Sequence, residues 1–265
     1  MSKKKITIIL SLVVLFLGIN YISSYAKDVE EIVKKAYNVA YYQGEDGKSE
    51  VRIAITDSQG RTRNRVFTIL RFDIEDGGKQ KYYVYFREPA GVRDMVYMVW
   101  KHPGEDDDRW LYLPALDLVR RIAASDKRSS FVGSDFLYED ISGRALSLDS
   151  HELVSEDKKQ YVIRNTPNNP NLVEFSYYDI YINKDNFVPT KAEYYDKEKE
   201  LFRKIEALEV KKVEGFITIV KQKASNLESG SETIAEFNQV DYNLGLSEDV
   251  FSERYLRRPP RRWIR

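Results

Sequence analysis

The sequence has no cysteine and only two histidines among its 265 residues. The absence of cysteine excludes disulfides, thiolate metal sites and cysteine nucleophiles together. The two histidines, His102 and His151, show neither an HxH nor an HExxH spacing, so they do not indicate a zinc site. An isolated histidine also lacks a marked partner that would position it as a general base. The composition therefore gives little support to an enzyme that relies on thiol, zinc or histidine chemistry.

Other catalytic signals are missing as well. The sequence contains no GxSxG motif and no glycine-rich phosphate loop after a strand. Its densest acidic run, Glu105-Asp106-Asp107-Asp108, lacks the residue order that spaces ligands around calcium, and we interpret it as a solvated loop. A carboxylate pair for glycoside hydrolysis stays open among 42 acidic residues, although nothing marks one. We predict a protein that is not an enzyme and that needs neither a metal nor a cofactor.

The first 26 residues predict export. A basic cluster, Lys3–Lys5, precedes an uncharged apolar run from Ile6 to Ile19, and Ser24-Tyr25-Ala26 supplies small residues for cleavage. The apolar run is too short for a bilayer core of about 30 Å, so a signal peptide over residues 1–26 is favoured over an uncleaved anchor. The chain has 42 basic and 42 acidic residues, and removing three signal lysines leaves 39 against 42. The mature chain from Lys27 therefore has no general attraction for nucleic acid or for an anionic membrane, and the basic C-terminus is the one local exception.

The mature chain is expected to be rich in β-structure. Residues Val29 to Tyr42 place apolar side chains at helical spacing, with Asp28 as an N-cap. After this helix the apolar period changes to two, and turn residues separate the segments, which is typical of an antiparallel meander. The predicted strands are Val51–Thr56, Arg65–Ile74, Gln80–Arg87, Met95–Lys101, Arg109–Leu113, Leu118–Ala123, Ala145–Val154, Gln160–Asn165, Glu174–Asn183, Thr190–Asp196, Leu201–Val210, Phe216–Ala224 and Thr233–Tyr242.

Two of these strands are apolar on both faces. In Arg65–Phe72 and Lys81–Phe86 the hydrophobic residues do not alternate with polar ones, so both faces must be covered. An ordinary two-layer core would explain the pattern. A curved sheet whose inner face holds a lipid under a helical lid would explain it too. A short helix with Ser247 as its N-cap is expected to close the domain.

The last residues, Arg254 to Arg265, carry six arginines together with Tyr255 and Trp263. Arginine beside aromatic residues suits phosphate head groups or an acidic protein surface. A solubilising tail is the alternative interpretation. The candidate docking residues in the tail, residues 257–265, are Arg257, Arg258, Arg261, Arg262 and Trp263.

A series of motifs carries a family resemblance. In chain order they are Phe86–Arg93, Trp110–Leu116, Val119–Ile122, Gly133–Phe136 and Tyr138–Asp140. The series resembles the outer membrane lipoprotein-sorting family, whose members have a LolA/LolB-like fold. The resemblance implies a single domain over residues 27–256. This domain would be a strongly curved antiparallel sheet, an incomplete β-barrel, with an N-terminal helix and short helices covering the concave face.

The resemblance also implies a function. LolA-type carriers shield lipoprotein acyl chains crossing the periplasm in an apolar hollow. We therefore expect a periplasmic carrier or chaperone for lipid or lipoprotein acyl chains, active as a monomer. Similarity to proteins encoded beside RND/MMPL-type exporters suggests the alternative of an accessory module. Such a module would dock on an inner-membrane exporter or an outer-membrane acceptor through the basic C-terminal tail.

Candidate site residues follow from these expectations. Those expected to line the hollow are Val33, Tyr37, Phe67, Ile69, Tyr83, Tyr85, Trp110 and Tyr112. Motif residues expected to act in structure or polar contacts are Phe86, Pro89, Pro114, Arg120, Arg121, Gly133, Asp135, Phe136 and Asp140. Neighbouring strand residues point to opposite faces, so one of the paired arginines is expected to reach an aspartate of the series or an acidic head group. The polar segment Ser125–Ser134 is interpreted as a mobile loop at the mouth of the hollow.

Overall fold

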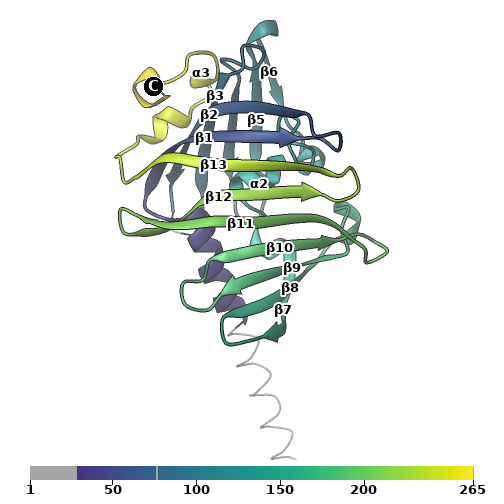
Figure 1. The fold of residues 1–265 in the computed structure, drawn as a ribbon. Helices are drawn as coiled ribbons and strands as arrows, with labels where there is room; N and C mark the ends of the chain where they lie inside the picture. Colours follow the sequence, from purple (N-terminus) through teal and green to yellow (C-terminus); the bar gives the residue numbers. More distant parts are fainter. Residues whose placement is uncertain (1–28, 76, 265) are drawn as a thin grey trace, which may run out of the picture.

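The structure is a computed structural model that describes residues 29–75 and 77–264, and the predicted signal peptide lies outside them. Within the described residues, thirteen antiparallel strands form one strongly curved sheet (Figure 1). The strands are β1 (Asp46–Thr56), β2 (Thr62–Asp73), β3 (Gln80–Glu88), β4 (Val96–Lys101), β5 (Asp108–Leu113), β6 (Leu118–Arg121), β7 (Asp149–Glu156), β8 (Gln160–Pro167), β9 (Tyr177–Asn183), β10 (Pro189–Tyr195), β11 (Leu201–Val213), β12 (Phe216–Asn226) and β13 (Ser231–Tyr242).

Two meanders make up this sheet. The strand order is β6-β5-β4-β3-β2-β1-β13-β12-β11-β10-β9-β8-β7, so strands follow the sequence in each half. The halves meet where β1 pairs with β13, from Gly47 opposite Tyr242 to Thr56 opposite Glu232. β6 and β7 are the two edges, so the sheet is not closed into a barrel.

The few helices cover opposite faces of the sheet. The N-terminal helix (residues 29–41) and α2 (Tyr138–Ser142) lie inside the curve (Figure 1). A 3-10 turn, η5 (Glu248–Phe251), and the helices α3 (Arg254–Arg257) and α4 (Arg261–Ile264) pack on the outside of β2 to β5. The other 3-10 turns are η1 (Pro114–Leu116), η2 (Ala124–Asp126), η3 (Leu146–Leu148) and η4 (Pro170–Leu172). No helix in the described part of the chain is long and apolar enough to cross a membrane.

The two-faced strands are covered on both faces by parts of the chain itself. On the concave side, Phe67, Phe86 and Tyr97 surround Phe131, with ring centroids 5.5–6.0 Å from it. On the convex side, Tyr83 and Met98 pack beneath the C-terminal segment. Aromatic pairs of this kind add to the free energy gained by apolar burial. The first meander therefore forms a rigid core with packed apolar side chains on both of its faces.

Three segments differ from what the sequence suggested. The segment Ser125–Ser134, interpreted as a mobile loop, is attached to the core at two residues, because Phe131 is 1% exposed and the side chain of Arg128 is 7% exposed. The predicted strand Ala145–Val154 begins only at Asp149, since its first residues form η3. Helix α2 was not predicted, because its five residues are too few to show a helical period.

Candidate functional site: a cavity under the N-terminal helix

A cavity of about 340 Å³ lies between the concave face of the sheet, the N-terminal helix and α2. Its walls come from both meanders and from the helix. From the strands, apolar lining residues include Val51, Ile53, Phe67, Ile69, Ile205 and Phe237. From the helix, they include Val33, Ala36, Tyr37 and Ala40.

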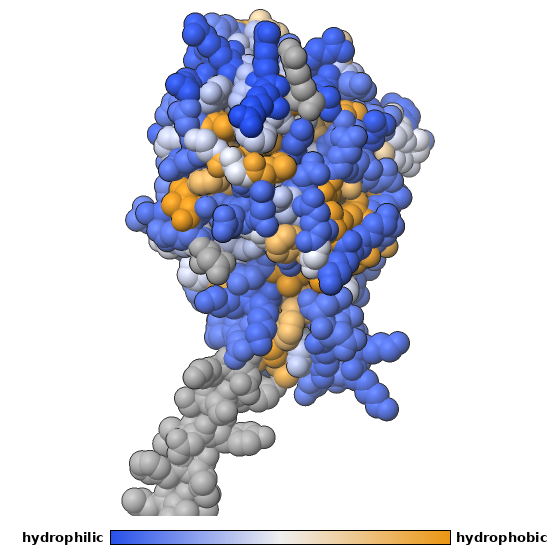
Figure 2. Space-filling model, turned by 90° about the vertical axis from the view of Figure 1, so that its left-hand side faces the viewer, coloured by the Kyte–Doolittle hydropathy of each residue, from blue (hydrophilic) through white to orange (hydrophobic). Residues whose placement is uncertain are grey.

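The helix is held over the sheet by one apolar stripe. Val29, Val33 and Ala36 are buried against Ile163 of β8 and Ile182 of β9. The charged residues of the helix lie on its exposed side, as the helical spacing predicts. The helix therefore packs on the second meander and leaves space beside it. Figure 2 presents the side of the molecule that lies on the left in Figure 1. It shows hydrophobic residues gathered there within an otherwise hydrophilic surface.

Polar side chains clamp the C-terminal end of the helix. Arg71 donates hydrogen bonds to the carbonyls of Tyr41 at 2.9 Å and Gly44 at 3.1 Å. Gln80 donates to the Tyr41 carbonyl at 2.8 Å. The last carbonyls of a helix have no partner within it, and a cation there also complements the helix dipole. These two β-strand residues therefore fix where the helix ends.

A buried lysine forms the third attachment of the helix. Lys101 of β4 is 3% exposed and donates to the hydroxyl of Tyr37 and to the carbonyls of Ser142 and Gly143. Burial lowers the pKa of Lys101 to about 8, because desolvation disfavours the charged form of its amine. The described residues supply no carboxylate in ion-pair contact with it. The lysine thus joins β4, the end of α2 and the N-terminal helix through neutral groups.

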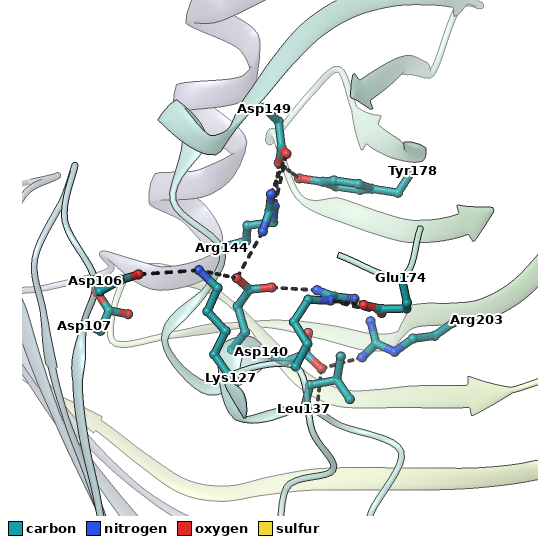
Figure 3. Close-up of polar contacts among 12 residues, drawn as sticks. Asp106, Asp107, Lys127, Leu137, Asp140, Arg144, Asp149, Glu174, Tyr178 and Arg203 are labelled. Carbon is teal, nitrogen blue, oxygen red and sulfur yellow. Dashed lines mark hydrogen bonds and ion pairs between the residues drawn. The ribbon is translucent and has the colours of Figure 1, made fainter. Parts of the chain in front are cut away.

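A network of charged side chains borders the cavity, and two of its members, Glu139 and Arg144, line it. Figure 3 shows the contacts of this network. Glu139 of α2 lies 2.6 Å from Arg128, 3.2 Å from Arg144 and 3.9 Å from Lys127. Burial alone would raise the pKa of Glu139, but the two arginines outweigh it and hold the pKa below the ordinary value. We call Arg128, Glu139, Arg144, Asp149 and Glu174 the charged wall.

The two remaining carboxylates of the charged wall each pair with one of its arginines. Arg128 pairs with Glu174 at 2.6 Å, and Arg144 pairs with Asp149 at 2.8 Å. Asp149 also accepts a hydrogen bond from Tyr178 at 2.8 Å (Figure 3). Every charge of the wall therefore has an opposite charge beside it, which suits a rigid support. In the described residues no group of three or more histidine, cysteine or carboxylate side chains could hold a metal ion.

The motif aspartates hold the loop before α2 to the second meander. Asp135 accepts a hydrogen bond from Thr233 of β13 at 2.7 Å. Asp140 accepts from the Leu137 amide at 2.7 Å and pairs with Arg203 of β11. These contacts place α2 and the charged wall against the cavity.

The predicted pairing of Arg120 or Arg121 with these aspartates is wrong. Arg121 pairs with Asp108, and Arg120 lies 3.8 Å from Asp126. Both arginines are mostly exposed, because β6 is the edge strand at the far end of the sheet. They reach no residue of the cavity.

Half of the residues expected to line the hollow do so. Val33, Tyr37, Phe67 and Ile69 line the cavity. The other four belong to the convex cluster under the C-terminal segment and do not line it: Tyr83, Tyr85, Trp110 and Tyr112. Successive side chains of a strand point to opposite faces, and with both faces apolar the sequence could not indicate which one lines the cavity.

The remaining motif residues lie in the core and in turns. Phe86 and Phe136 are buried in the concave core. Pro89 follows the last residue of β3, and Pro114 is the first residue of η1. Gly133 has a φ of +80°, which favours glycine in the tight turn before α2.

The C-terminal residues do not form a detached tail. Pro260 and Ile264 are buried, and Ile264 packs in the convex cluster. Trp263 is half-buried beside it, whereas the four arginines expected to dock are exposed: Arg257, Arg258, Arg261 and Arg262.

Comparison with known proteins defines the class of this fold. A putative outer membrane lipoprotein-sorting protein domain from Vibrio parahaemolyticus matches with a TM-score of 0.81 and 22% identity, over 88% of this chain and 100% of the other. A LolA superfamily protein from Nitrosomonas europaea matches with a TM-score of 0.66 and 18% identity, over 86% and 98%. The fold is therefore LolA-like, which confirms the predicted fold class.

One further solved structure is similar to this chain, and a family model shows its family. A DUF1329 family protein from Desulfovibrio piger has a TM-score of 0.81 and 28% identity, over 88% of this chain and 99% of the other. A family model described as "-like: Uncharacterized protein" matches residues 78–258, which is more than half of the chain. The protein belongs to the family that this model describes. Its structural neighbours are DUF1329 and lipoprotein-sorting proteins. No match was found among curated proteins.

Proposed function

We propose that this protein is a carrier that shields the acyl chains of a lipid or lipoprotein in the cavity under its N-terminal helix. The observation that carries the proposal is the apolar lining of this cavity, which is formed jointly by the sheet and the helix. A ligand pocket typically measures about 300–1,000 Å³, so the cavity is large enough for a small apolar ligand with the helix in place. Displacing the helix would lengthen the space along the sheet.

Binding of an acyl chain would be driven by removal of its methylenes from water. Each buried methylene contributes about 0.8 kcal/mol, so a handful of them gives measurable affinity. The charged wall offers no unpaired cation to a head group, since both of its arginines already contact carboxylates. We therefore infer that the chain, and not the head group, is the part held inside.

The same features support a role without catalysis. A catalytic site needs a nucleophile or base within reach of substrate and of a group that positions it. Glu139 and Arg144 on the cavity wall are engaged in ion pairs, and most of the lining is apolar. The proposal places a single-domain monomer in the periplasm, in keeping with the predicted signal peptide and with neighbours described as lipoprotein-sorting proteins.

A cavity-filling substitution tests the carrier function. Ala207 of β11 lines the cavity, whereas the next residue, Leu208, does not line it and is 46% exposed. Ala207→Trp should lower the affinity for a fluorescent fatty-acyl probe at least tenfold, because the indole occupies the space of the chain. Leu208→Trp is the matched control, with the same new side chain one residue away, and should bind the probe normally.

Probe titrations and native mass spectrometry of the protein recovered after export give the outcome. Co-purified lipid in the wild type that is reduced only in Ala207→Trp supports the proposal. Failure of the wild type to bind any acyl probe or to retain lipid would refute it. The alternative, an exporter-associated module, requires a protein partner for the exposed C-terminal arginines. Binding to vesicles and to protease-treated membranes distinguishes such a partner from lipid.

A further inference from the structure

One end of the molecule combines exposed arginines with an exposed apolar hairpin tip. The tip between β5 and β6 carries Leu116 and Leu118, which are 70% and 46% exposed. The C-terminal helices lie beside it, because Arg257 contacts Asp117 at 2.9 Å and its guanidinium lies 5.8 Å from the ring centre of Tyr112. In Figure 1 the tip and these helices occupy the same end of the molecule, opposite β7. We call Leu116, Leu118, Arg258, Arg261, Arg262 and Trp263 the arginine–leucine end.

The arginines of this end have an uncompensated charge. Residues 250–264 contain five arginines and one acid, Glu253. Arg254 pairs with Asp249 and Arg257 with Asp117, which leaves three arginines that form no ion pair with a described residue. These three are exposed although Pro260 and Ile264, between and beside them, are buried. The fold thus anchors the segment by its apolar residues and presents its guanidinium groups to the outside.

We propose that the arginine–leucine end docks on the surface of an anionic phospholipid bilayer. Arginine binds phosphate through paired N–H groups and keeps its charge, and cationic clusters are attracted to anionic lipid. An exposed leucine beside them can enter the acyl boundary, and a half-buried tryptophan suits the level of the head groups. A protein surface would satisfy the arginines alone, whereas a bilayer also accounts for a leucine held outward on a tight turn.

The turn itself supports this role. Asp117 has a φ of 44° and closes η1 through its amide, which donates to the Pro114 carbonyl. Pro114 begins the turn and fixes its own backbone angle. A protruding leucine on a rigid turn loses little conformational entropy when it enters the bilayer. The cavity lies elsewhere, under the N-terminal helix, so docking and acyl binding are separable.

Vesicle binding of the exported, processed protein tests the proposal. Sedimentation with vesicles of phosphatidylcholine alone is compared with vesicles that contain roughly a third phosphatidylglycerol. The protein should bind only the anionic vesicles, and molar salt should release it. The triple variant Arg258→Gln, Arg261→Gln, Arg262→Gln should bind them about 100-fold more weakly, since each cation near the surface contributes roughly fivefold.

Matched controls separate this end from general charge and exposure. The triple variant Lys158→Gln, Lys159→Gln, Lys212→Gln removes three exposed lysines, two in the turn between β7 and β8 and one near the end of β11, and should bind normally. Leu116→Ser should weaken binding roughly tenfold. Leu172→Ser alters a leucine that is also 70% exposed and should have no effect.

The outcomes are distinct from those of the carrier test. Equal binding to both kinds of vesicle, or full binding by the arginine variant, would overturn the proposal. Association with native membranes that is lost after their proteins are digested would overturn it as well, and would indicate an acidic protein partner. The arginine variant should bind the acyl probe as the wild type does, so either proposal can fail without the other.

Discussion

The two ends of the chain cover opposite faces of one sheet in different ways. The C-terminal segment lies on the convex face and inserts Phe251, Leu256 and Ile264 into an apolar cluster. The N-terminal helix lies on the concave face, touches the sheet along one stripe and leaves a cavity beside it. Its end is held by Arg71 and Lys101, through hydrogen bonds.

This difference indicates which cover can move. Opening the C-terminal cover would expose several fully buried apolar side chains at once, which costs free energy in proportion to their area. Opening the helix would expose the smaller stripe of Val29, Val33 and Ala36 and break a few hydrogen bonds whose groups water can satisfy, each of which contributes only about 1 kcal/mol net. The convex cover therefore acts as part of the core, and the concave cover is the one suited to admit a ligand.

Removing an apolar anchor of the convex cover should have the largest effect. Phe251 is fully buried and its ring lies 5.9 Å from that of Phe72. Phe251→Ala should lower the free energy of unfolding by about 4 kcal/mol, through lost burial and the cavity left behind. Urea unfolding followed by tryptophan fluorescence measures it. A loss below about 1 kcal/mol would mean that this segment is not part of the core.

Neutralising the centre of the charged wall should have the next largest effect. Glu139→Gln would leave Arg128 and Arg144 buried with one partner each, and should cost about 3 kcal/mol. The control is Glu206→Gln, because Glu206 pairs with Lys223 at a partly exposed site and should contribute less than about 1 kcal/mol. Equal urea midpoints for the two variants would contradict a structural role for the wall.

The buried lysine predicts an unusual dependence of stability on pH. The pKa of Lys101 is 10.5 when unperturbed and about 8 in the folded protein, so the unfolded chain binds more protons between these values. The free energy of unfolding should therefore rise by about 2 kcal/mol between roughly pH 7 and pH 9.5. Above about pH 10 the buried tyrosines, such as Tyr37 and Tyr82, oppose it, because burial raises their pKa well above 10.0.

Unfolding midpoints at several pH values test this lysine. Lys101→Met removes the titrating group, so the rise between pH 7 and pH 9.5 should disappear in this variant. A rise of the same size in both proteins would assign the effect to other residues.

Loss of one hydroxyl that attaches each cover, Tyr37 in the helix and Tyr83 in the sheet beneath the C-terminal segment, should have the smallest effect and the sharpest contrast. Tyr37 of the helix accepts from Lys101, and Tyr83 donates to the Tyr255 carbonyl at 2.7 Å. Tyr37→Phe and Tyr83→Phe should each cost about 1 kcal/mol. Stopped-flow binding of the acyl probe should become faster only in Tyr37→Phe. Equal acceleration in both variants would argue against the helix as the moving cover.

The local elements were predictable because each has a short-range cause. The alternation in Phe216–Ala224 predicted β12, and the observed strand, Phe216–Asn226, differs only at its last residues. Ser247 was predicted as an N-cap, and its side chain accepts from the Asp249 amide. Such patterns depend on residues within a few positions of one another, which a single sequence contains.

The site was less predictable because its partners come from distant segments. Glu139 contacts Arg128 and Arg144, and none of the three stands out among 84 charged residues. Lys101 ends a strand that is otherwise apolar, and only the three-dimensional packing shows that it is buried. Which face of a strand that is apolar on both faces lines the cavity depends on the direction in which the sheet curves. A period of two in the sequence does not specify that direction.

The pairing of β1 with β13 has a consequence for how the molecule is assembled. The amide of Leu246 donates to Asp46, 200 residues earlier in the chain, beside the junction of the two meanders. The first six strands can pair with their sequence neighbours as they are synthesised, but β1 keeps a free edge until the last strand arrives. Contacts of such high sequence separation slow folding. During this interval the exposed edge of β1 is a site where a second chain could add, so folding yield should depend on protein concentration.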